Sequence, residues 1–383
     1  MKRSLNRILT THCGSLPRTD RLQPLMGLLA RGEILDQREL SEAVIESTGE
    51  VIRQQIEAGI DVGNSGEQAR ISFSSYVTQR MSGFGSHGQR MNAKDLVEHG
   101  LSQPGMANPA AVNLRAPPKC VEAVHYENLD AAINECDEFT RIMRDSKETF
   151  EESFMTAASP GIIAMTMQND HYPSYENYLF AVAEEMRKEY ELIVSKGFIL
   201  QLDCPDLAME RHMSYQDKSL ASFQDRVALN VKAINYSLEN IAADRVRLHV
   251  CWGNYEGPHN YDVSLEDILP HLYDANVGAL SLEMANPRHA HEYKLFAQYP
   301  LPESMILIAG VIDTKTKYVE HPEVVSDRIL RVTRVLGDKS RVIAGTDCGF
   351  DTSAGAGRVD KSLVWAKLKS LFEGAQIATQ AAT

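Results

Sequence analysis

The chain lacks most of the features that would place it in a membrane, outside the cell or on a nucleic acid. Its 383 residues contain no apolar run near the roughly 20 residues that a membrane span requires. The opening segment, MKRSLNRILTTHCG, is basic but has no apolar stretch after it, so secretion is not expected. The formal net charge of −13 argues against nucleic acid or an anionic membrane as the main partner.

Cysteine is also scarce, with six residues scattered singly along the chain. This spacing differs from the dense disulfide framework of a small secreted scaffold. We therefore expect a cytoplasmic protein with reduced thiols, in which Cys120 and Cys136 are small buried apolar residues. The hydrophobic fraction of 43% is ample for a substantial core.

Short β-rich runs recur along the chain, and most are followed by a helical pattern of apolar residues. The runs are residues 8–14, 60–66, 161–167, 198–204, 246–252, 278–284, 305–313 and 342–350. This alternation predicts an α/β fold, a closed parallel (β/α)8 TIM barrel. The main alternative, a doubly wound open sheet, would carry a glycine-rich phosphate loop after an early strand, and GFGSHG at 83–88 follows a helix-like segment instead.

One long interruption separates the second run from the third. Residues 71–155 contain a segment that reads as extended, APPKCVEAVHYE, and a helical stretch that begins at NLDAAINEC. A connection of this length usually has secondary structure of its own and often shapes a binding site. We therefore predict one TIM-barrel domain over 1–383, with 71–155 as an insertion that shapes the site.

Ionisable or metal-binding residues stand at the ends of most of these runs. The C-terminal ends of barrel strands meet at one face, which is the catalytic face in enzymes of this fold. Eight such side chains exceed what the stability of a barrel needs, so the pattern indicates an active site. The residues are His12, Glu67, Asp203, His249, Cys251, Glu283, Asp313 and Cys348.

A metal site is the most specific prediction from this set. Residues i and i+2 of a strand point to the same side, so His249 and Cys251 converge. Together with Glu283 and Cys348 they offer an imidazole, two thiolates and a carboxylate, a set that suits tetrahedral zinc. The alternative is that Cys348 is a core residue and Glu283 pairs with a neighbour such as Arg288.

The sequence also indicates what such a zinc ion would do. The ligands are far apart in the chain and meet only when the barrel has closed, which favours a functional ion over a structural one. Zinc with two thiolates and one carboxylate carries a charge of about −1 and is a poor activator of water. It is better suited to hold a further thiolate that attacks a carbon electrophile.

These residues lie in segments that resemble the cobalamin-independent methionine synthase family, specifically its C-terminal catalytic barrel. The similarity covers nearly the whole chain. The segments follow in the family's order: THCGSLPR at 11–18, GNSGEQ at 63–68, then ILQLDCPDL, LHVCWG, LSLEMA, AGVID and AGTDCGF.

The resemblance implies roles for individual residues. The amino-acid end of homocysteine would be held by Glu67 and Asp203, which receive its ammonium group, and by the loop around Ser15, which receives its carboxylate. The implied reaction is attack of a zinc-bound thiolate on a methyl group to give a thioether. The partners are therefore a small-molecule thiol and a methyl or alkyl donor. The implied Zn²⁺ ligands are His249, Cys251, Glu283 and Cys348.

The chain departs from the family on the donor side. The family enzyme has two barrels, whereas this chain holds one. Where the family has a tryptophan that stacks on folate, this chain reads MTMQNDHY at 165–172. Where the family has a histidine thought to relay protons, this chain has Lys315, shortly after Asp313. We predict that Lys315 and Asp313 are catalytic and that the methyl donor is not ordinary polyglutamylated folate; the alternative for Lys315 is a solvated loop lysine.

Other functions remain open at this level. Epoxyalkane:coenzyme M transferase resembles the same single-barrel branch and uses zinc to form a thiolate that opens an epoxide, where Lys315 would protonate the oxygen or pair with the sulfonate. Methyl transfer from a corrinoid, the related metal-free decarboxylase barrel and a non-catalytic thiol-binding protein are further alternatives. The sequence is compatible with a homo-oligomer.

Overall fold

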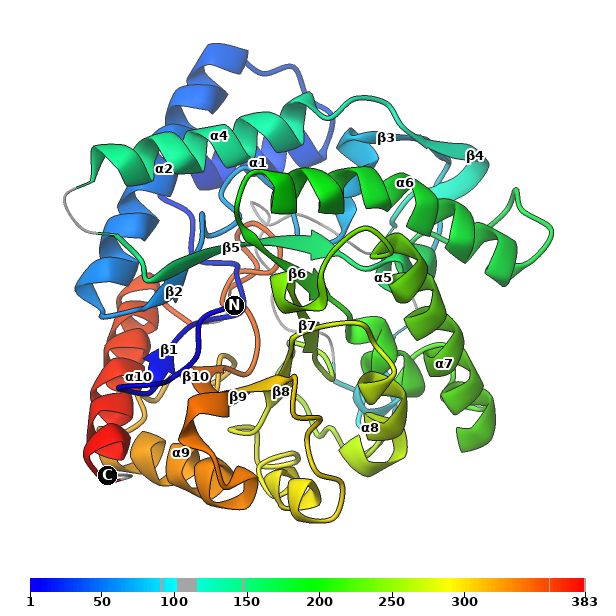
Figure 1. The fold of residues 1–383 in the computed structure, drawn as a ribbon. Coiled ribbons are helices and arrows are strands. Elements are labelled where there is room, and N and C mark those ends of the chain that lie inside the picture. Colours follow the sequence, from blue (N-terminus) through cyan, green and yellow to red (C-terminus); the bar gives the residue numbers. More distant parts are fainter. Residues whose placement is uncertain (90–91, 102–115, 147–148, 358, 382–383) are drawn as a thin grey trace.

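Eight parallel strands form a closed barrel surrounded by helices (Figure 1). The computed structural model describes residues 1–89, 92–101, 116–146, 149–357 and 359–381. The strand order is β1-β10-β9-β8-β7-β6-β5-β2, and a parallel bridge between Thr11 and Val62 joins the two edges. The predicted (β/α)8 barrel is therefore confirmed. Its strands are β1 (Leu9–Thr10), β2 (Val62–Gly63), β5 (Glu152–Ala158), β6 (Ile199–Asp203), β7 (Val246–Val250), β8 (Ala279–Glu283), β9 (Ile306–Ile312) and β10 (Val342–Thr346).

Most of the longer helices start at a side chain that accepts a hydrogen bond from the first turn, which stabilises a helix N-terminus. These capping residues are Asp36, Ser159, Ser174, Ser219, Ser264 and His321. The α-helices are α1 (Leu22–Ala30), α2 (Gln37–Glu57), α3 (Lys94–Glu98), α4 (Asp130–Asp145), α5 (Pro160–Thr166), α6 (Tyr175–Ser195), α7 (Leu220–Ser237), α8 (Leu265–Tyr273), α9 (Pro322–Leu336) and α10 (Lys361–Ala381). The short 3-10 helices are η1 (Ser75–Gln79), η2 (Pro205–Leu207), η3 (Met209–His212), η4 (Ala243–Arg245), η5 (Glu292–Ala297) and η6 (Lys339–Arg341).

The predicted position of the third barrel strand is wrong. The third strand is β5, and residues 161–167 lie mostly in the helix α5 that follows it. The hydroxyl of Ser159 accepts a hydrogen bond from the N–H of Ile162 at 3.0 Å, and Pro160 occupies the first helical position. Both features start a helix, and a short apolar run does not by itself distinguish a strand from a buried helix. The predicted insertion at 71–155 therefore overlaps the start of β5.

The described part of this insertion contains the extended and helical elements that the sequence predicts. Strands β3 (Met81–Gly85) and β4 (Lys119–Tyr126) form an antiparallel pair, and α4 follows them. Residues 90–91, 102–115 and 147–148 lie outside the described residues. A buried network ties the segment to the barrel wall, because Arg80 donates to Glu135 of α4 at 2.7 Å and to Glu189 of α6 at 3.1 Å.

The interior of the barrel changes from apolar to polar toward the C-terminal ends of the strands. At the opposite end, apolar side chains such as Leu9, Ile306 and Phe154 fill the space. Above them lies Arg247, which donates to the side chain of Gln201 at 2.8 Å and packs over the ring of Phe154 at 3.5 Å. Burial lowers the pKa of Arg247 to about 10. This layer forms the floor of the polar site described below.

Gly310 in β9 is required by a close approach between two strands. A β-carbon at this position would lie 2.4 Å from Oδ1 of Asp347 and 2.9 Å from the carbonyl oxygen of Leu282. We expect Gly310→Ala to lower the free energy of unfolding by about 1–3 kcal/mol, because neither the backbone nor a buried carboxylate yields easily.

Urea denaturation measures this effect, with Gly49→Ala as the matched control. Gly49 lies in α2 and a β-carbon there would have no neighbour within 4 Å. The control should be neutral or stabilising by about 0.5–1 kcal/mol, since alanine favours a helix over glycine. Equal unfolding midpoints for the two variants would contradict the packing around Gly310.

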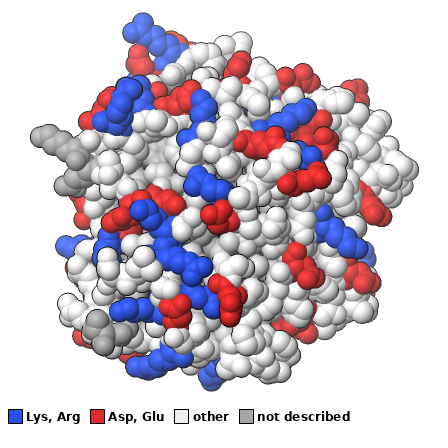
Figure 2. Space-filling view, viewed as in Figure 1, with Lys and Arg blue, Asp and Glu red and all other residues white. Residues whose placement is uncertain are grey.

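Acidic and basic side chains are interspersed on the face of the molecule shown in Figure 2. That face offers no field of one sign of the kind that nucleic-acid binding needs. None of the helices in the described ranges is long and apolar enough to cross a membrane.

Candidate active site

Three of the four predicted metal ligands converge at the C-terminal end of the barrel. One ligand atom from each of His249, Cys251 and Cys348 lies within 4.8 Å of the other two, and all three residues are buried. The alternation of β7 accounts for the first two, since Arg247, His249 and Cys251 occupy alternate positions along one strand. The prediction that these residues meet is confirmed.

Cys348 lies two residues beyond the last residue of β10, where strand alternation no longer sets the direction of a side chain. It lies an odd number of residues beyond Ile343, an apolar residue of the barrel interior, so strict alternation would turn its side chain outward. The pairing of β10 with β9 shifts register between Gly345 and Thr346. The extra residue is Val311 of β9, since Gly345 pairs with Gly310 and Thr346 with Ile312, so it lies opposite the strand that leads to Cys348.

The thiols of Cys251 and Cys348 lie close together in a buried site, which opposes the ionisation of Cys348. The adjacent Cys251 thiol and burial raise the pKa of Cys348 well above its usual value. A thiolate at this position therefore needs a cation close by. The His/Cys/Cys set fits a thiophilic divalent ion, which would provide that charge directly.

The fourth predicted ligand, Glu283, ends β8 beside this group but has protein partners. Its Oε1 accepts the backbone N–H of Trp252 at 3.0 Å, and its Oε2 accepts from Asn286 and from Lys315, both at 3.3 Å. Glu283 is not part of the three-residue group. Because Trp252 directly follows Cys251, the carboxylate stands next to the thiol ligands, and its role as a ligand stays a prediction.

Lys315 is buried, so the alternative of a solvated loop lysine is wrong. Burial lowers the pKa of this amine, but the charges of Glu283, Asp347 and Asp313 outweigh burial and raise the pKa well above its usual value. Asp313 accepts the backbone N–H of Lys315 at 2.7 Å through Oδ1 and thereby shapes the loop that carries the lysine. The catalytic role predicted for this pair remains untested.

Asp203 links the metal-binding group to the predicted substrate pocket. Its Oδ1 lies 3.0 Å from Nδ1 of His249 and accepts from the amide of Gln201 at 2.7 Å. A carboxylate on one ring nitrogen favours the tautomer that presents the other nitrogen, Nε2, to a metal, and Nε2 here lies 3.3 Å from the backbone carbonyl of Asp347. The sequence predicted Asp203 as a substrate residue only, so its contact with His249 is an additional finding.

Glu67 presents an unpartnered carboxylate oxygen in the same region. Oε1 accepts from the hydroxyl of Thr156 at 3.0 Å, whereas the buried Oε2 has no hydrogen-bond partner, and neither does the amide nitrogen of Asn64. Burial and the charge of Asp203 raise the pKa of Glu67 to about 7. Gly14 keeps the space beside it open, since a β-carbon there would lie 2.7 Å from Oε1.

Ser15 lies where the loops after β1 and β10 meet. Its carbonyl oxygen accepts the N–H of Phe350 at 2.9 Å, and its hydroxyl lies against Gly349, where a β-carbon would be 2.0 Å away. The hydroxyl is therefore next to the residue that follows Cys348. This position agrees with the predicted substrate contact, which stays a prediction.

His12 does not join the metal-binding group, although the sequence places it at the same rim. Its Nε2 lies 2.8 Å from the side-chain oxygen of Gln55 in α2, and its Nδ1 accepts from the N–H of Gly14 at 3.1 Å. Burial lowers the pKa of His12 to about 4. This neutral imidazole ties β1 to α2.

Asp347 is the main site residue that sequence reasoning missed. Its carboxylate accepts the backbone N–H groups of Met284, Ala285 and Asn286 at 2.9, 2.9 and 2.7 Å. It therefore fixes the loop that follows Glu283. The sequence signal that could have identified Asp347 as a site residue is its position directly before Cys348. Thr156 was missed because the third strand was misplaced.

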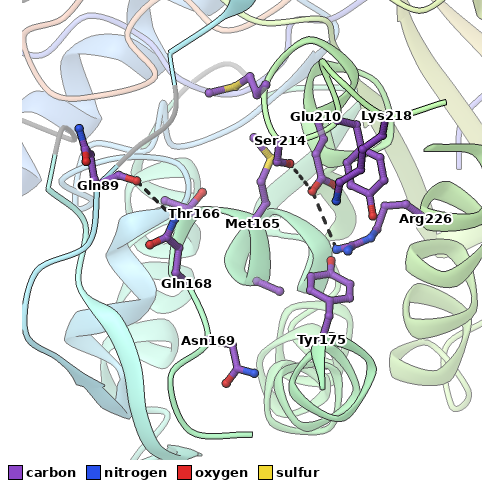
Figure 3. Close-up of a pocket in the computed structure, with 13 residues that line it drawn as sticks. Gln89, Met165, Thr166, Gln168, Asn169, Tyr175, Glu210, Ser214, Lys218 and Arg226 are labelled. Atoms are coloured by element: carbon purple, nitrogen blue, oxygen red, sulfur yellow. Dashed lines mark hydrogen bonds and ion pairs between the residues drawn. The ribbon is translucent and has the colours of Figure 1, made fainter. Parts of the chain in front are cut away.

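A separate pocket opens where the sequence departs from the methionine synthase pattern. It has a volume of about 230 Å³ (Figure 3). Glu210 accepts from Ser214 at 2.7 Å and lies 3.9 Å from the guanidinium of Arg226, so one part of the wall is charged. Neither tryptophan of the chain lines it. The lining includes Met165, Thr166, Gln168 and Asn169 from the end of α5 and the segment after it.

Comparisons with known proteins find relatives that match nearly the whole chain. No family model matches the sequence. The chain is 26% identical to a methionine synthase of Thermococcus kodakarensis over 377 residues, which cover 96% of this chain and 92% of that protein. It is also 26% identical to a methionine synthase of Pyrococcus furiosus, over 95% of this chain and 90% of that one.

The fold has a solved counterpart of nearly the same length. A B12-independent methionine synthase from Shewanella sp. W3-18-1, determined in complex with selenomethionine, superimposes with a TM-score of 0.74 over 98% of this chain and 99% of that one, at 18% identity. At this identity the superposition is evidence for the fold, and the sequence relatives provide the evidence for kinship. The chain is therefore similar over nearly its whole length to methionine synthases and has the fold of a B12-independent methionine synthase.

Proposed function

We propose that this protein transfers a methyl group from a small-molecule donor to the thiol of homocysteine, giving methionine. One observation carries the proposal: the His249, Cys251 and Cys348 group lies next to a pair of buried carboxylates, Glu67 and Asp203. Asp203 links this group to Glu67, because it lies 3.0 Å from His249 and its charge raises the pKa of Glu67. A thiol-binding centre thus adjoins a site for an ammonium group.

Zinc is the metal that this donor set suits, and when bound it would keep the substrate sulfur electron-rich and ready to attack a methyl carbon. His249, Cys251 and Cys348 would hold it, with Glu283 as the fourth ligand. Glu283 would then give up part of its contact with Lys315. Asp203 keeps the imidazole of His249 oriented, and Asp347 keeps the loop after Glu283 in place.

The carboxylate pair favours homocysteine over coenzyme M as the acceptor thiol. The buried Oε2 of Glu67 has no partner, and the nearby charge of Asp203 makes the pocket negative. An ammonium group would satisfy both carboxylates, whereas the sulfonate of coenzyme M would be repelled by them. The relatives reported above are methionine synthases, which likewise does not favour the epoxide-opening alternative.

The methyl donor is expected to differ from ordinary polyglutamylated folate. The residues after β5 line a pocket without a tryptophan, and Lys315 stands where the family has a histidine. A leaving group that needs less protonation than the tertiary amine of a folate would suit this site. Methylcobalamin and sulfonium compounds are donors of this kind.

The test is a matrix of thiols and donors incubated with the zinc-loaded protein, with the thioether product identified by mass spectrometry. Homocysteine should yield methionine with at least one donor, and methyltetrahydrofolate should be a poor one. A product from coenzyme M with none from homocysteine would overturn the acceptor assignment. Binding of homocysteine without turnover by any donor would leave only a thiol-binding protein.

Lys315→Met should lower kcat by about 10–100-fold with little change in the affinity for homocysteine. The lysine is ion-paired with Glu283 at 3.3 Å, and its removal takes a positive charge away from the electron pair that forms on the leaving group. Steady-state kinetics measure this effect. Lys317→Met is the matched control, because Lys317 is an exposed residue of the same loop. Equal kcat values for both variants would remove Lys315 from the mechanism.

A further inference from the structure

Three histidine side chains surround one carboxylate behind the proposed metal site. His259 Nδ1 and His289 Nε2 each lie 2.9 Å from Oδ2 of Asp262, and His212 Nδ1 lies 3.1 Å from Oδ1. We call these four residues the Asp262 cluster. They come from η3 and from the loops after β7 and β8, and all four side chains are buried. No part of the proposed reaction uses them.

The hydrogen bonds of His259 require a doubly protonated ring. Nδ1 faces the carboxylate of Asp262, and Nε2 faces the backbone carbonyl of Tyr255 at 2.9 Å. Both partners can only accept a hydrogen bond, whereas a neutral imidazole has a single N–H. Since both bonds need a donor on the ring, His259 is an imidazolium cation.

The same reasoning applies to His289. Its Nε2 faces Asp262 at 2.9 Å and its Nδ1 faces Oε2 of Glu292 at 2.8 Å. Two carboxylates accept from this ring, so both nitrogens carry hydrogen. Burial lowers the pKa of His289, but the bonds to Asp262 and Glu292 outweigh burial and raise it to about 10.

Aromatic rings cover both cations. The indole of Trp252 stacks on His289 with a centroid distance of 4.1 Å and an angle of 28°, and the ring of Tyr255 stacks on His259 at 4.2 Å and 19°. An aromatic face attracts a cation, most strongly where water is excluded. The stacking therefore favours the charged form of each ring.

The remaining charged groups around the cluster come from α3, η3 and β8. Asp95 accepts from the hydroxyl of Tyr255 and from the backbone N–H of His259, both at 2.8 Å. The same hydroxyl lies 3.3 Å from Nε2 of His212. Burial raises the pKa of Glu283, but the charges of Lys315, His289 and His259 bring it below its usual value. The cluster thus acts electrostatically on the proposed metal site.

Trp252 connects the cluster to that site mechanically. It directly follows Cys251, and its backbone N–H donates to Oε1 of Glu283 at 3.0 Å. Its indole N–H donates to the carbonyl of Val263, next to Asp262, at 2.7 Å. The ring that stacks on His289 therefore belongs to the residue that holds Cys251 and Glu283 together.

We propose that His259 and His289 stay doubly protonated at neutral pH and act as positioning residues: they form a cationic wall behind Trp252 that fixes Cys251 and Glu283 and balances the negative charge of a thiolate-bound metal. The protonation state stands on the hydrogen bonds alone. The benefit to the metal centre rests on the proposed function.

Nitrogen NMR of the protein labelled with ¹⁵N-histidine tests the protonation state directly. At pH 8 an ordinary histidine is neutral, because its pKa is about 6.5. In the zinc-loaded protein, where the ring of His249 would bind the metal, we expect the rings of His259 and His289 to show the imidazolium pattern, with both nitrogens protonated. His259→Asn and His289→Gln assign these signals by their loss. Neutral patterns for all rings at pH 8 would overturn the proposal even if neither variant folds.

Zinc affinity, measured by competition with a chelator, tests the positioning role. His289→Gln keeps a donor near Asp262 but removes the charge and the bond to Glu292, so its zinc affinity should fall by about 10–100-fold. His125→Gln is the control, because His125 is exposed on β4. His259→Asn is a second variant, since asparagine tolerates the φ of 53° at that position.

Unchanged zinc affinity in both cluster variants would refute the positioning role. The proposed function would be refuted by a different result. In that case the imidazolium signals are present and both variants bind zinc more weakly, but the protein makes no methionine.

Discussion

Replacing Cys348 or Cys251 with alanine should remove the metal and the methyl transfer together. Each thiol is one of three ligand groups that the fold gathers within 4.8 Å. We expect the zinc content to fall from about one ion per chain to below about 0.2, because the two remaining ligand residues would bind zinc weakly. We expect kcat to fall by about 10³-fold or more. Elemental analysis and a turnover assay on the same samples measure both effects.

Cys136→Ala is the matched control for this experiment. Cys136 is an equally buried free thiol, but it lies in α4 and packs in the core. Its replacement should leave the zinc content at about one ion per chain, although it costs some stability. Undiminished zinc in both Cys251→Ala and Cys348→Ala would show that the metal, if any, binds elsewhere.

Glu67→Gln should weaken the binding of L-methionine by roughly 30–100-fold, which corresponds to about 2–3 kcal/mol for a charged hydrogen bond. The unpartnered Oε2 of Glu67 is the group we assign to the ammonium of the amino acid. Calorimetry with methionine is preferable to homocysteine, because methionine has no thiol that titrates. Glu122→Gln is the control, since Glu122 is exposed on β4.

The same ligand should show a pH dependence that Glu67 controls. Burial and Asp203 raise the pKa of Glu67 to about 7, so the carboxyl group is protonated below that pH and ionised above it. Only the ionised form attracts an ammonium group, hence methionine affinity should rise between pH 6 and pH 8. Glu67→Gln should lose this rise. A wild-type affinity that is flat across this range would contradict the assignment.

The sequence predicts those parts of the site that follow from strand geometry. His249 and Cys251 meet because residues i and i+2 along a strand point to the same side. The apolar run at 246–252 correctly predicts the strand β7, which Cys251 directly follows. Cys348 was predicted from its place at the end of the last apolar run, although it lies beyond β10, where alternation does not fix its direction. The closed barrel itself follows from the repeated alternation of strand and helix patterns.

The parts that the sequence does not reveal depend on contacts between distant loops. The third strand was misplaced because a short apolar helix and a short buried strand look alike in sequence. Thr156 lies in the true third strand, β5, and was therefore not identified as a site residue. The sequence left a buried, catalytic Lys315 and a solvated one as alternatives, since its partner Glu283 lies on another strand. The Asp262 cluster was not predicted for the same reason, because its histidines come from η3 and from the loops after β7 and β8.

The central claim is that this centre activates a thiol by binding it to a metal. X-ray absorption at the zinc edge tests the claim most directly, with the protein measured alone and with saturating homocysteine. The claim predicts two sulfur ligands at about 2.3 Å in the free protein and three when homocysteine is present. An unchanged count of two sulfurs with homocysteine demonstrably bound would contradict it.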